Sequence, residues 1–238
     1  MSISEIISDA IRYPFSDITK FLIIGIIALL AGFANLLDPF DIDGFAMKAV
    51  FTILSIIFSL MLSGIGLNVI KNAIAHSDEI PVLDPVNNIL DGIKFLIVSI
   101  VYFLIPMVIT FVLAIFFGVL GAGLNHIGAA TAIVAVIAIV LFIIFGIFQI
   151  IAIARLAKTG DFGAAFDIGA VLDDVKKIGI GKIILFLIIS LVIIMIAALI
   201  ASFLAIIPFI GLILSQIVIG AFVVLFYYRG IGLIYSEA

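Results

Sequence analysis

The chain has 238 residues, of which 66% are hydrophobic and 11% are charged, and its formal net charge is −4. Its mean hydropathy is +1.56, and its apolar share lies well above the roughly 45 to 50% of globular proteins. This composition excludes an ordinary water-soluble domain and predicts an integral membrane protein. The absence of cysteine excludes disulfides, thiolate metal sites and palmitoylation.

The charged residues divide the chain into long uncharged segments. A membrane span needs about 20 residues, so the uncharged segments 21–37 and 49–70 hold one span each. The segments 95–154 and 183–228 contain 60 and 46 residues and must each turn back once. Glycines around Asn125 and His126 favour the first turn, and Pro208 favours the second. We therefore expect an all-α protein with six spans, near 21–37, 49–70, 95–119, 131–154, 183–206 and 209–228.

One short charged phrase occurs three times at a constant offset of 82 residues: "ISDAIR" at 7–12, "ILDGIK" at 89–94 and "VLDDVK" at 171–176. Each copy belongs to an amphipathic stretch that is too short and too charged to span, as expected of a helix lying in the membrane interface. We interpret the chain as one membrane domain, 1–238, with repeat units of about 1–75, 80–158 and 163–238. Each unit is an interfacial helix followed by a transmembrane hairpin, and the three predict a closed bundle with pseudo-threefold symmetry. The alternative is that the phrase marks the membrane border without any duplication.

The basic residues predict the orientation. Ten of them lie on the side of both termini, and Lys48 alone lies on the other. Basic residues concentrate on the cytoplasmic side of membrane proteins. We expect a multi-pass plasma-membrane protein with both termini in the cytoplasm. The first twenty residues contain Glu5, Asp9, Arg12 and Asp17, which argues against a cleavable signal peptide.

Four stretches carry a resemblance to a known family: "AIRYPFSDITKFLIIGIIALL", "DEIPVLDPVNNILDGIKFLIVSIVYFLIP", "ARLAKTGDFGAAFD" and "IPFIGLILSQIVIGAFVVLFYYRGIGLIY". Together they resemble an uncharacterised archaeal family of multi-pass membrane proteins classed as a domain of unknown function. That family is distantly similar to the membrane domain of bacterial glycerophosphodiester phosphodiesterases, although the catalytic barrel of those enzymes has no counterpart in this chain. The resemblance implies a fold and an archaeal plasma membrane, and no site residue follows from it.

The sequence offers little catalytic chemistry. No Asp, Glu, Lys or Arg lies within a predicted span, which argues against a proton relay or a charge-based carrier. The histidines have no evident partners, so we expect no metal site, no cofactor and no enzymatic activity. Ser55, Ser59 and Ser63 share one helical face, where hydroxyls more often allow close helix packing than attack a substrate. Pro106 is expected to kink the third span, leaving a carbonyl that Ser99, Thr110 or another helix would help to satisfy.

Two groups of residues are candidates for binding. Polar residues within the spans need hydrogen-bond partners, so they either line a small pocket or join helices: Asn68, Gln149, Ser215 and Gln216. Basic residues at the cytoplasmic border are candidates for lipid headgroups: Arg12, Lys94, Arg155, Lys176 and Arg229.

We predict a non-enzymatic protein that binds or handles membrane lipids. The alternatives are a structural subunit or scaffold of a membrane complex, as a homo-oligomer or with another protein, and a small-solute channel or carrier. We expect membrane lipids as partners and no nucleic acid.

Overall fold

The computed structural model describes residues 1–36, 44–123, 127–207 and 210–238, and the regular elements in these residues are all helical. In chain order they are α1 (Ile3–Arg12), η1 (Tyr13–Phe15), α2 (Ile18–Ala31), η2 (Phe33–Leu36), α3 (Phe45–Ile74), α4 (Pro85–Gly123), α5 (Ile127–Thr159), η4 (Gly163–Phe166), α6 (Ile168–Ile178), α7 (Ile180–Leu204), α8 (Ile210–Ser215), the π-helical η5 (Gln216–Gly220) and α9 (Ala221–Tyr235).

Five helical segments are long and apolar enough to cross a membrane: α3, α4, α5, α7 and the continuous segment formed by α8, η5 and α9. A sixth candidate is the pair of α1 with η1 and α2, which bends by 87° between Phe15 and Ile18. The chain is therefore a multi-pass membrane protein with five to six candidate spans. The first predicted span, 21–37, corresponds to the 14-residue helix α2 and the short η2.

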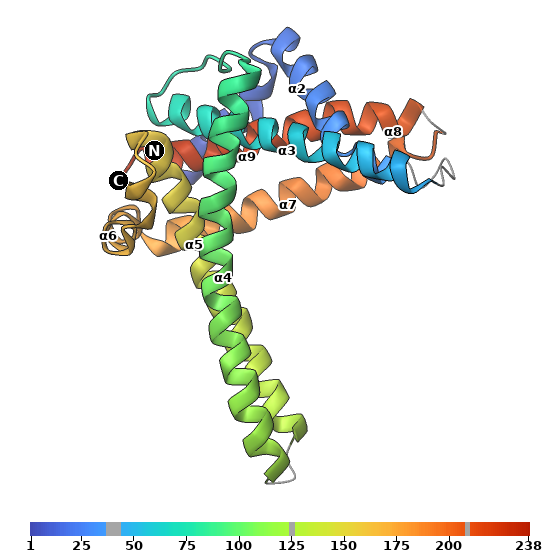
Figure 1. Cartoon of the computed structure of the whole chain (residues 1–238). Coiled ribbons are helices and arrows are strands. Elements are labelled where there is room, and N and C mark those ends of the chain that lie inside the picture. Colours follow the sequence, from blue (N-terminus) through green and yellow to red (C-terminus); the bar gives the residue numbers. More distant parts are fainter. Residues whose placement is uncertain (37–43, 124–126, 208–209) are drawn as a thin grey trace.

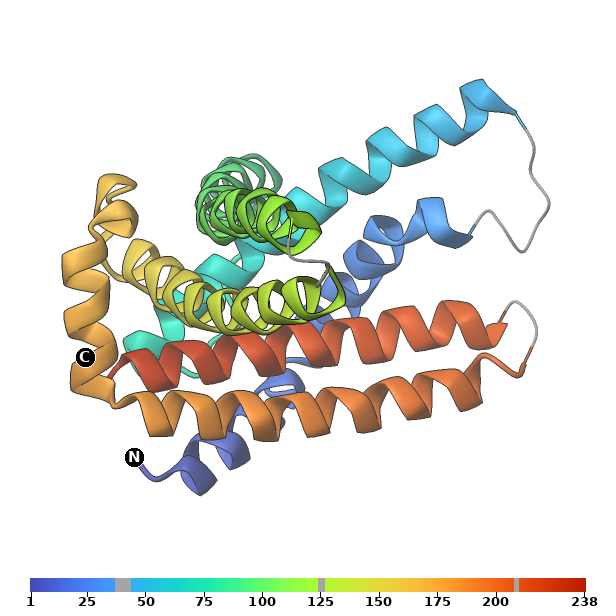
Figure 2. The same ribbon diagram turned by 90° about the horizontal axis from the view of Figure 1, so that it is seen from below.

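The helices form three hairpins that do not close into the predicted bundle. Figures 1 and 2 show α2–α3 and α7–α9 extending toward the same end of the molecule, whereas Figure 1 shows the α4–α5 hairpin leaving in a different direction. In the most apolar part of α4, 6% of the residues are buried. Apolar helix surfaces gain little from closing on one another in lipid, so the apolar pattern did not specify closure.

The two termini meet at the inner end of the hairpins (Figure 1). The amino group of Met1 lies 2.9 Å from the Glu237 carboxylate, which also accepts a 2.6 Å hydrogen bond from Lys182 at the start of α7. Both termini thus lie at the same end of the molecule. The buried core lies at this inner end and includes Ile6, Ile70, Ile151 and Leu156.

Two of the three expected interfacial helices are separate helices. Helix α1 has the expected capping box between Ser2 and Glu5, and α6 begins at the N-cap Asp167 and ends at Gly179, whose φ is 92°. The second expected interfacial helix is wrong as a separate element, because residues 85–94 are the first turns of α4. Asp84 caps that helix as predicted, accepting hydrogen bonds from the backbone N–H groups of Val86 and Asn87.

The reason for this continuity is a close contact between α3 and α4. A Cβ atom added at Gly64 would lie 1.8 Å from the backbone oxygen of Asn88, and one at Gly92 would lie 1.9 Å from the backbone oxygen of Leu60. Each glycine therefore allows the backbone of the opposite helix to approach, as small residues do between transmembrane helices. Gly92 is therefore a residue of α4 that contacts α3 at the crossing, and it does not end the helix.

The loops and inner breaks differ from expectation in two places. Helix α4 continues through Gly118 to Gly123, so the predicted turn begins later, while Asn125, His126 and Pro208 lie outside the described residues. Pro106 lies within α4, but the hydroxyls of Ser99 and Thr110 are buried without a hydrogen-bond partner in the described part of the chain. Ser55 joins helices as expected, since its hydroxyl accepts a 2.9 Å hydrogen bond from the Ala34 N–H at the end of the first hairpin.

Candidate functional site

The most deeply buried charge of the described residues is Arg229 on α9, whose exposed fraction is 2%. Its Nε donates to Asp9 of α1 at 2.7 Å, and its terminal nitrogens donate to the Asp78 carboxylate at 2.6 Å and to the Ser77 carbonyl. The guanidinium also lies over the Tyr13 ring, 4.6 Å from its centroid. Arg229 thereby joins α9 to α1 and to the α3–α4 connection.

A second buried cluster connects α5, α6 and α9. Arg155 donates to the Asp174 carboxylate at 2.8 Å, and the Tyr235 hydroxyl donates to the same carboxylate at 2.7 Å. Burial pushes the pKa of Asp174 up, but the hydrogen bonds from Tyr235 and Arg155 outweigh this effect, and the pKa lies below its usual value. Asp174 is therefore held as a carboxylate between three helices.

The third polar contact joins α3 to α4. The Asn68 amide donates to the side chains of Asn88 at 3.2 Å and Asp91 at 3.4 Å, and Lys94 pairs with Asp91 at 2.9 Å. In all three clusters, a polar residue near the inner end of one hairpin binds a carboxylate of the segment that begins another hairpin.

These contacts decide which of the predicted headgroup residues remain available. Arg229 is buried and bound on several sides, so the prediction that it faces lipid headgroups is wrong. Arg155 and Lys94 are partly exposed and bind Asp174 and Asp91. Lys176 pairs with Asp173, with both side chains 66% exposed. Arg12 is exposed and makes no ion pair with a described residue.

An apolar groove of about 640 Å³ lies between α5, α7 and α9. Its walls include Phe142, Ile147, Ile188 and Leu191, and Phe95 of α4 also contributes. It has no acidic, basic or histidine side chain in its described lining. Its size is that of ligand sites in proteins, about 300 to 1,000 Å³.

Three polar side chains line this groove: Gln149, Tyr227 and Tyr228. None of them makes a hydrogen bond to a described residue. Tyr228 packs against Gly66, where an added Cβ would lie 2.3 Å from the ring, and edge-on against Phe95 at 5.9 Å between centroids. Tyr227 stacks on Phe186 at 6.5 Å. The rings are held by packing, while the polar groups are left for a bound molecule or water.

The four predicted pocket residues have separate surroundings. Gln149 lines the groove, whereas Asn68 bonds to Asn88 and Asp91, in agreement with its alternative role of joining helices. Ser215 donates to the carbonyl of Leu212 at 2.8 Å within its own helix. Gln216 begins the π-helical η5 and is exposed, so the expectation that it faces the interior is wrong. The π-helix adds a residue to its turn and so rotates the residues around it relative to an uninterrupted α-helix.

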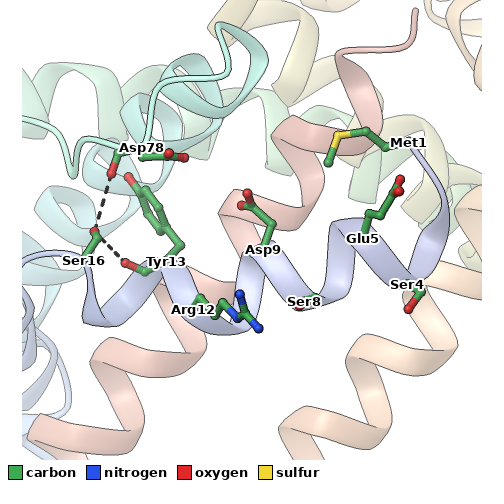
Figure 3. Close-up of a pocket in the computed structure, with 9 residues that line it drawn as sticks. All are labelled: Met1, Ser4, Glu5, Ser8, Asp9, Arg12, Tyr13, Ser16 and Asp78. Atoms are coloured by element: carbon green, nitrogen blue, oxygen red, sulfur yellow. Dashed lines mark hydrogen bonds between the residues drawn. The ribbon is translucent and has the colours of Figure 1, made fainter.

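A second cavity follows the polar side of α1, with a volume of about 650 Å³ (Figure 3). It is lined by Glu5, Asp9, Arg12 and Tyr13 of the first helices and by Asp78 of the α3–α4 connection. Ser16 donates to the Tyr13 carbonyl at 2.8 Å beside it. Among the described residues, no three acidic or histidine side chains are grouped as a metal site would need.

The sequence did not reveal the groove tyrosines as a site. Tyr227 and Tyr228 lie two residues and one residue before Arg229, at the end of a span, where tyrosine is common as an interface anchor. A signal was nevertheless present, because two adjacent tyrosines point to different sides of a helix and therefore do not both face the same surroundings. The sequence likewise contains the glycines of the α3–α4 crossing, but it does not show that Gly64 contacts Asn88 or that Gly92 contacts Leu60.

Residues 47–206, from α3 to α7, match the model of a family described as "Protein of unknown function (DUF4013)". No curated protein and no solved structure matches the chain, so the distant similarity to phosphodiesterase membrane domains stays a prediction. Since the family match covers more than half of the sequence, the chain belongs to the DUF4013 family.

Proposed function

We propose that this DUF4013 protein is a non-enzymatic lipid-binding protein and that the groove between α5, α7 and α9 is its lipid site. The observation that carries the proposal is the combination of apolar walls with three polar groups, from Gln149, Tyr227 and Tyr228, that lack hydrogen-bond partners among the described residues. A polar group at membrane depth is costly unless it is hydrogen-bonded. A lipid with hydroxyl, ester or ether oxygens would supply those bonds.

The order of residues along the helices supports an amphiphile in one orientation. Gln149 lies six residues before Arg155 on α5, and Phe142 lies thirteen residues before it, which are distances of about 9 Å and 20 Å along the axis. Tyr228 directly precedes Arg229 on α9. The polar part of a lipid would therefore lie near the inner, charged end of the molecule, and its chains would extend past Phe142 toward the membrane centre.

Other functions have less support. A channel needs a continuous wetted path, and the groove walls are mainly apolar. An enzyme needs a nucleophile with a base or a metal, and the groove lining has no acid, base or histidine. A scaffold role for a membrane complex, with a second copy or another protein, remains the alternative, since the outer part of the α4–α5 hairpin is free to contact a partner.

We also propose that the fold arose by duplication of the units 1–75, 80–158 and 163–238. Asn68 of the first unit binds Asp91 of the second, Arg155 of the second binds Asp174 of the third, and Arg229 of the third binds Asp9 of the first. This cyclic order is what three related units around one axis would give, although Asp174 takes the part expected of Asp173. The plasma membrane, with the charged inner end and both termini in the cytoplasm, is proposed from the distribution of basic residues.

The lipid site can be tested by filling the groove. A Cβ atom at Gly146 meets no atom within 4 Å, and Gly146 lines the groove, so Gly146→Leu would add a side chain to the site from a backbone position that has room for its Cβ. Gly118→Leu is the matched control, because its Cβ also meets nothing and it lies outside the groove lining. We expect native mass spectrometry in mild detergent to show a bound phospholipid on the wild type and the control and about tenfold less on Gly146→Leu, a change equivalent to about 1.4 kcal/mol.

Equal lipid retention by all three proteins would contradict the proposal and favour the scaffold function. The melting temperatures of both variants should be measured by far-UV circular dichroism. Equal values would show that a loss of bound lipid does not result from unfolding.

A further inference from the structure

The outer side of α1 carries a stripe of unused hydrogen-bond donors. Ser4, Ser8 and Arg12 are spaced four residues apart, so they lie on one face of the helix. Figure 3 shows them along the edge of the α1 cavity that Glu5 and Asp9 also line. In the described part of the chain, neither serine hydroxyl makes a hydrogen bond and Arg12 makes no ion pair. The stripe therefore offers a guanidinium and two hydroxyls to a ligand.

The acidic residues of α1 make no ion pair with Arg12. The Glu5 carboxylate accepts a 2.7 Å hydrogen bond from the Ser2 N–H in the capping box. The Asp9 carboxylate is bound by Arg229 at 2.7 Å. Both acids line the α1 cavity together with Ser4, Ser8 and Arg12, but their carboxylates are engaged by these partners, whereas the Arg12 guanidinium makes no ion pair with a described residue.

An apolar groove of about 520 Å³ runs beside this stripe, between α1 and α7. Its floor is formed by Ile3, Ile7, Ile11 and Ile189, and its remaining lining is Ser4, Ser8 and Arg12. One wall is thus suited to a hydrocarbon chain, and the other to an anion. The bend of 87° between α1 and α2 places α1 along the membrane surface if α2 crosses the membrane.

We propose that this groove binds an anionic phospholipid, with the phosphate on Arg12, Ser8 and Ser4 and one chain on the isoleucines between α1 and α7. Arginine and hydroxyl groups are common ligands of phosphate oxygens, and a free phosphate would leave the apolar floor unused. This site is separate from the lipid site proposed above. The α7 residues that line the first groove are Ile184, Leu187, Ile188 and Leu191. At 3.6 residues per turn, Ile189 points roughly 150° away from their mean direction, so the two grooves lie on different sides of α7.

The test uses the full chain in nanodiscs made from an equal mixture of dioleoylphosphatidylglycerol and dioleoylphosphatidylcholine. After transfer to mild detergent, native mass spectrometry should show the anionic lipid retained by the wild type. We expect Arg12→Gln to reduce this retention about tenfold, with a smaller loss for the double variant Ser4→Ala and Ser8→Ala. Lys71→Gln is the control, because Lys71 is an exposed base without an ion pair to any described residue.

Three results would overturn this inference. They are equal retention of the two lipids by the wild type, loss of the anionic lipid in Lys71→Gln to the same extent as in Arg12→Gln, and displacement of the lipid by millimolar inorganic phosphate. The last result would identify a phosphate site without a chain site. In the Gly146→Leu background the anionic lipid should remain, so that failure of one site is distinguishable from failure of the other.

Discussion

Replacing Arg229 with alanine should be among the most destabilising single changes in this protein. The side chain is 2% exposed and holds Asp9, Asp78 and the Ser77 carbonyl. Removing one member of a buried ion pair costs about 3 to 5 kcal/mol, because the remaining charge is left without a partner. Asp78 is 82% exposed and can be solvated, and Asp9 is 33% exposed, so we expect the lower limit of about 3 kcal/mol.

For a chain of this length, a loss of about 3 kcal/mol corresponds to a fall of roughly 6 to 12 °C in Tm. The assay is pulse proteolysis along an SDS titration, supported by thermal unfolding in detergent monitored by circular dichroism. Lys71→Ala provides an exposed control for the loss of a positive charge and should leave the stability unchanged. The double variant Asp9→Ala with Arg229→Met should be less destabilised than the sum of the single changes, because it removes both charges. A fall of less than about 2 °C in Arg229→Ala would refute the view that this residue joins the hairpins.

Two further predictions concern the crossing of α3 with α4 and the response to acid. Gly64→Ala places a Cβ 1.8 Å from the Asn88 oxygen, so it should destabilise the protein by about 2 kcal/mol or more. Gly118→Ala is the control, because its Cβ meets no atom within 4 Å. Equal unfolding midpoints for the two variants would contradict the close crossing of α3 and α4. The lowered pKa of Asp174 predicts stability that is present above its unfolded value near pH 4 and is lost as the pH falls through the lower folded value. Asp174→Asn should remove that part of the acid response in thermal unfolding between neutral and acidic pH, and an unchanged acid profile would show that Asp174 does not contribute.

The local features of the fold were predictable where one residue type has one physical role. The long uncharged segments predicted membrane-spanning helices, because charge is expensive in lipid. Ser2 with Glu5, and Asp84 before Pro85, indicated helix starts that the structure contains. The start of α4 at Pro85, ten residues before the expected span, was not predictable in this way. It depends on the contact between α3 and α4 that Gly64 and Gly92 allow.

The candidate site was less predictable because it depends on which charges find each other. Arg12 and Arg229 look alike in the sequence as basic residues at the border of the membrane. In the structure, Arg229 is surrounded by acids from α1 and from the α3–α4 connection, whereas Arg12 faces outward. Pairings over such sequence separations are set by the packing of whole helices. The sequence therefore predicted a basic border, but not which of its members remain available to a ligand.

The distribution of buried residues suggests why binding would occur near the inner end. The large side chains that are almost fully buried, such as Arg229, Tyr235, Ile70 and Leu156, belong to the charged end of the hairpins. Toward the other end of α4, Phe111, Phe116 and Val119 are 65%, 62% and 72% exposed. In lipid, such apolar surfaces gain little from closing on one another, because the hydrocarbon around them is equally apolar. The hairpins can consequently diverge from a fixed inner end, and a lipid that fills the space between α5 and α7 near this end would contact two hairpins at once. A bound lipid would thus stabilise one relative position of the α4–α5 hairpin, and its loss would leave that position less restricted.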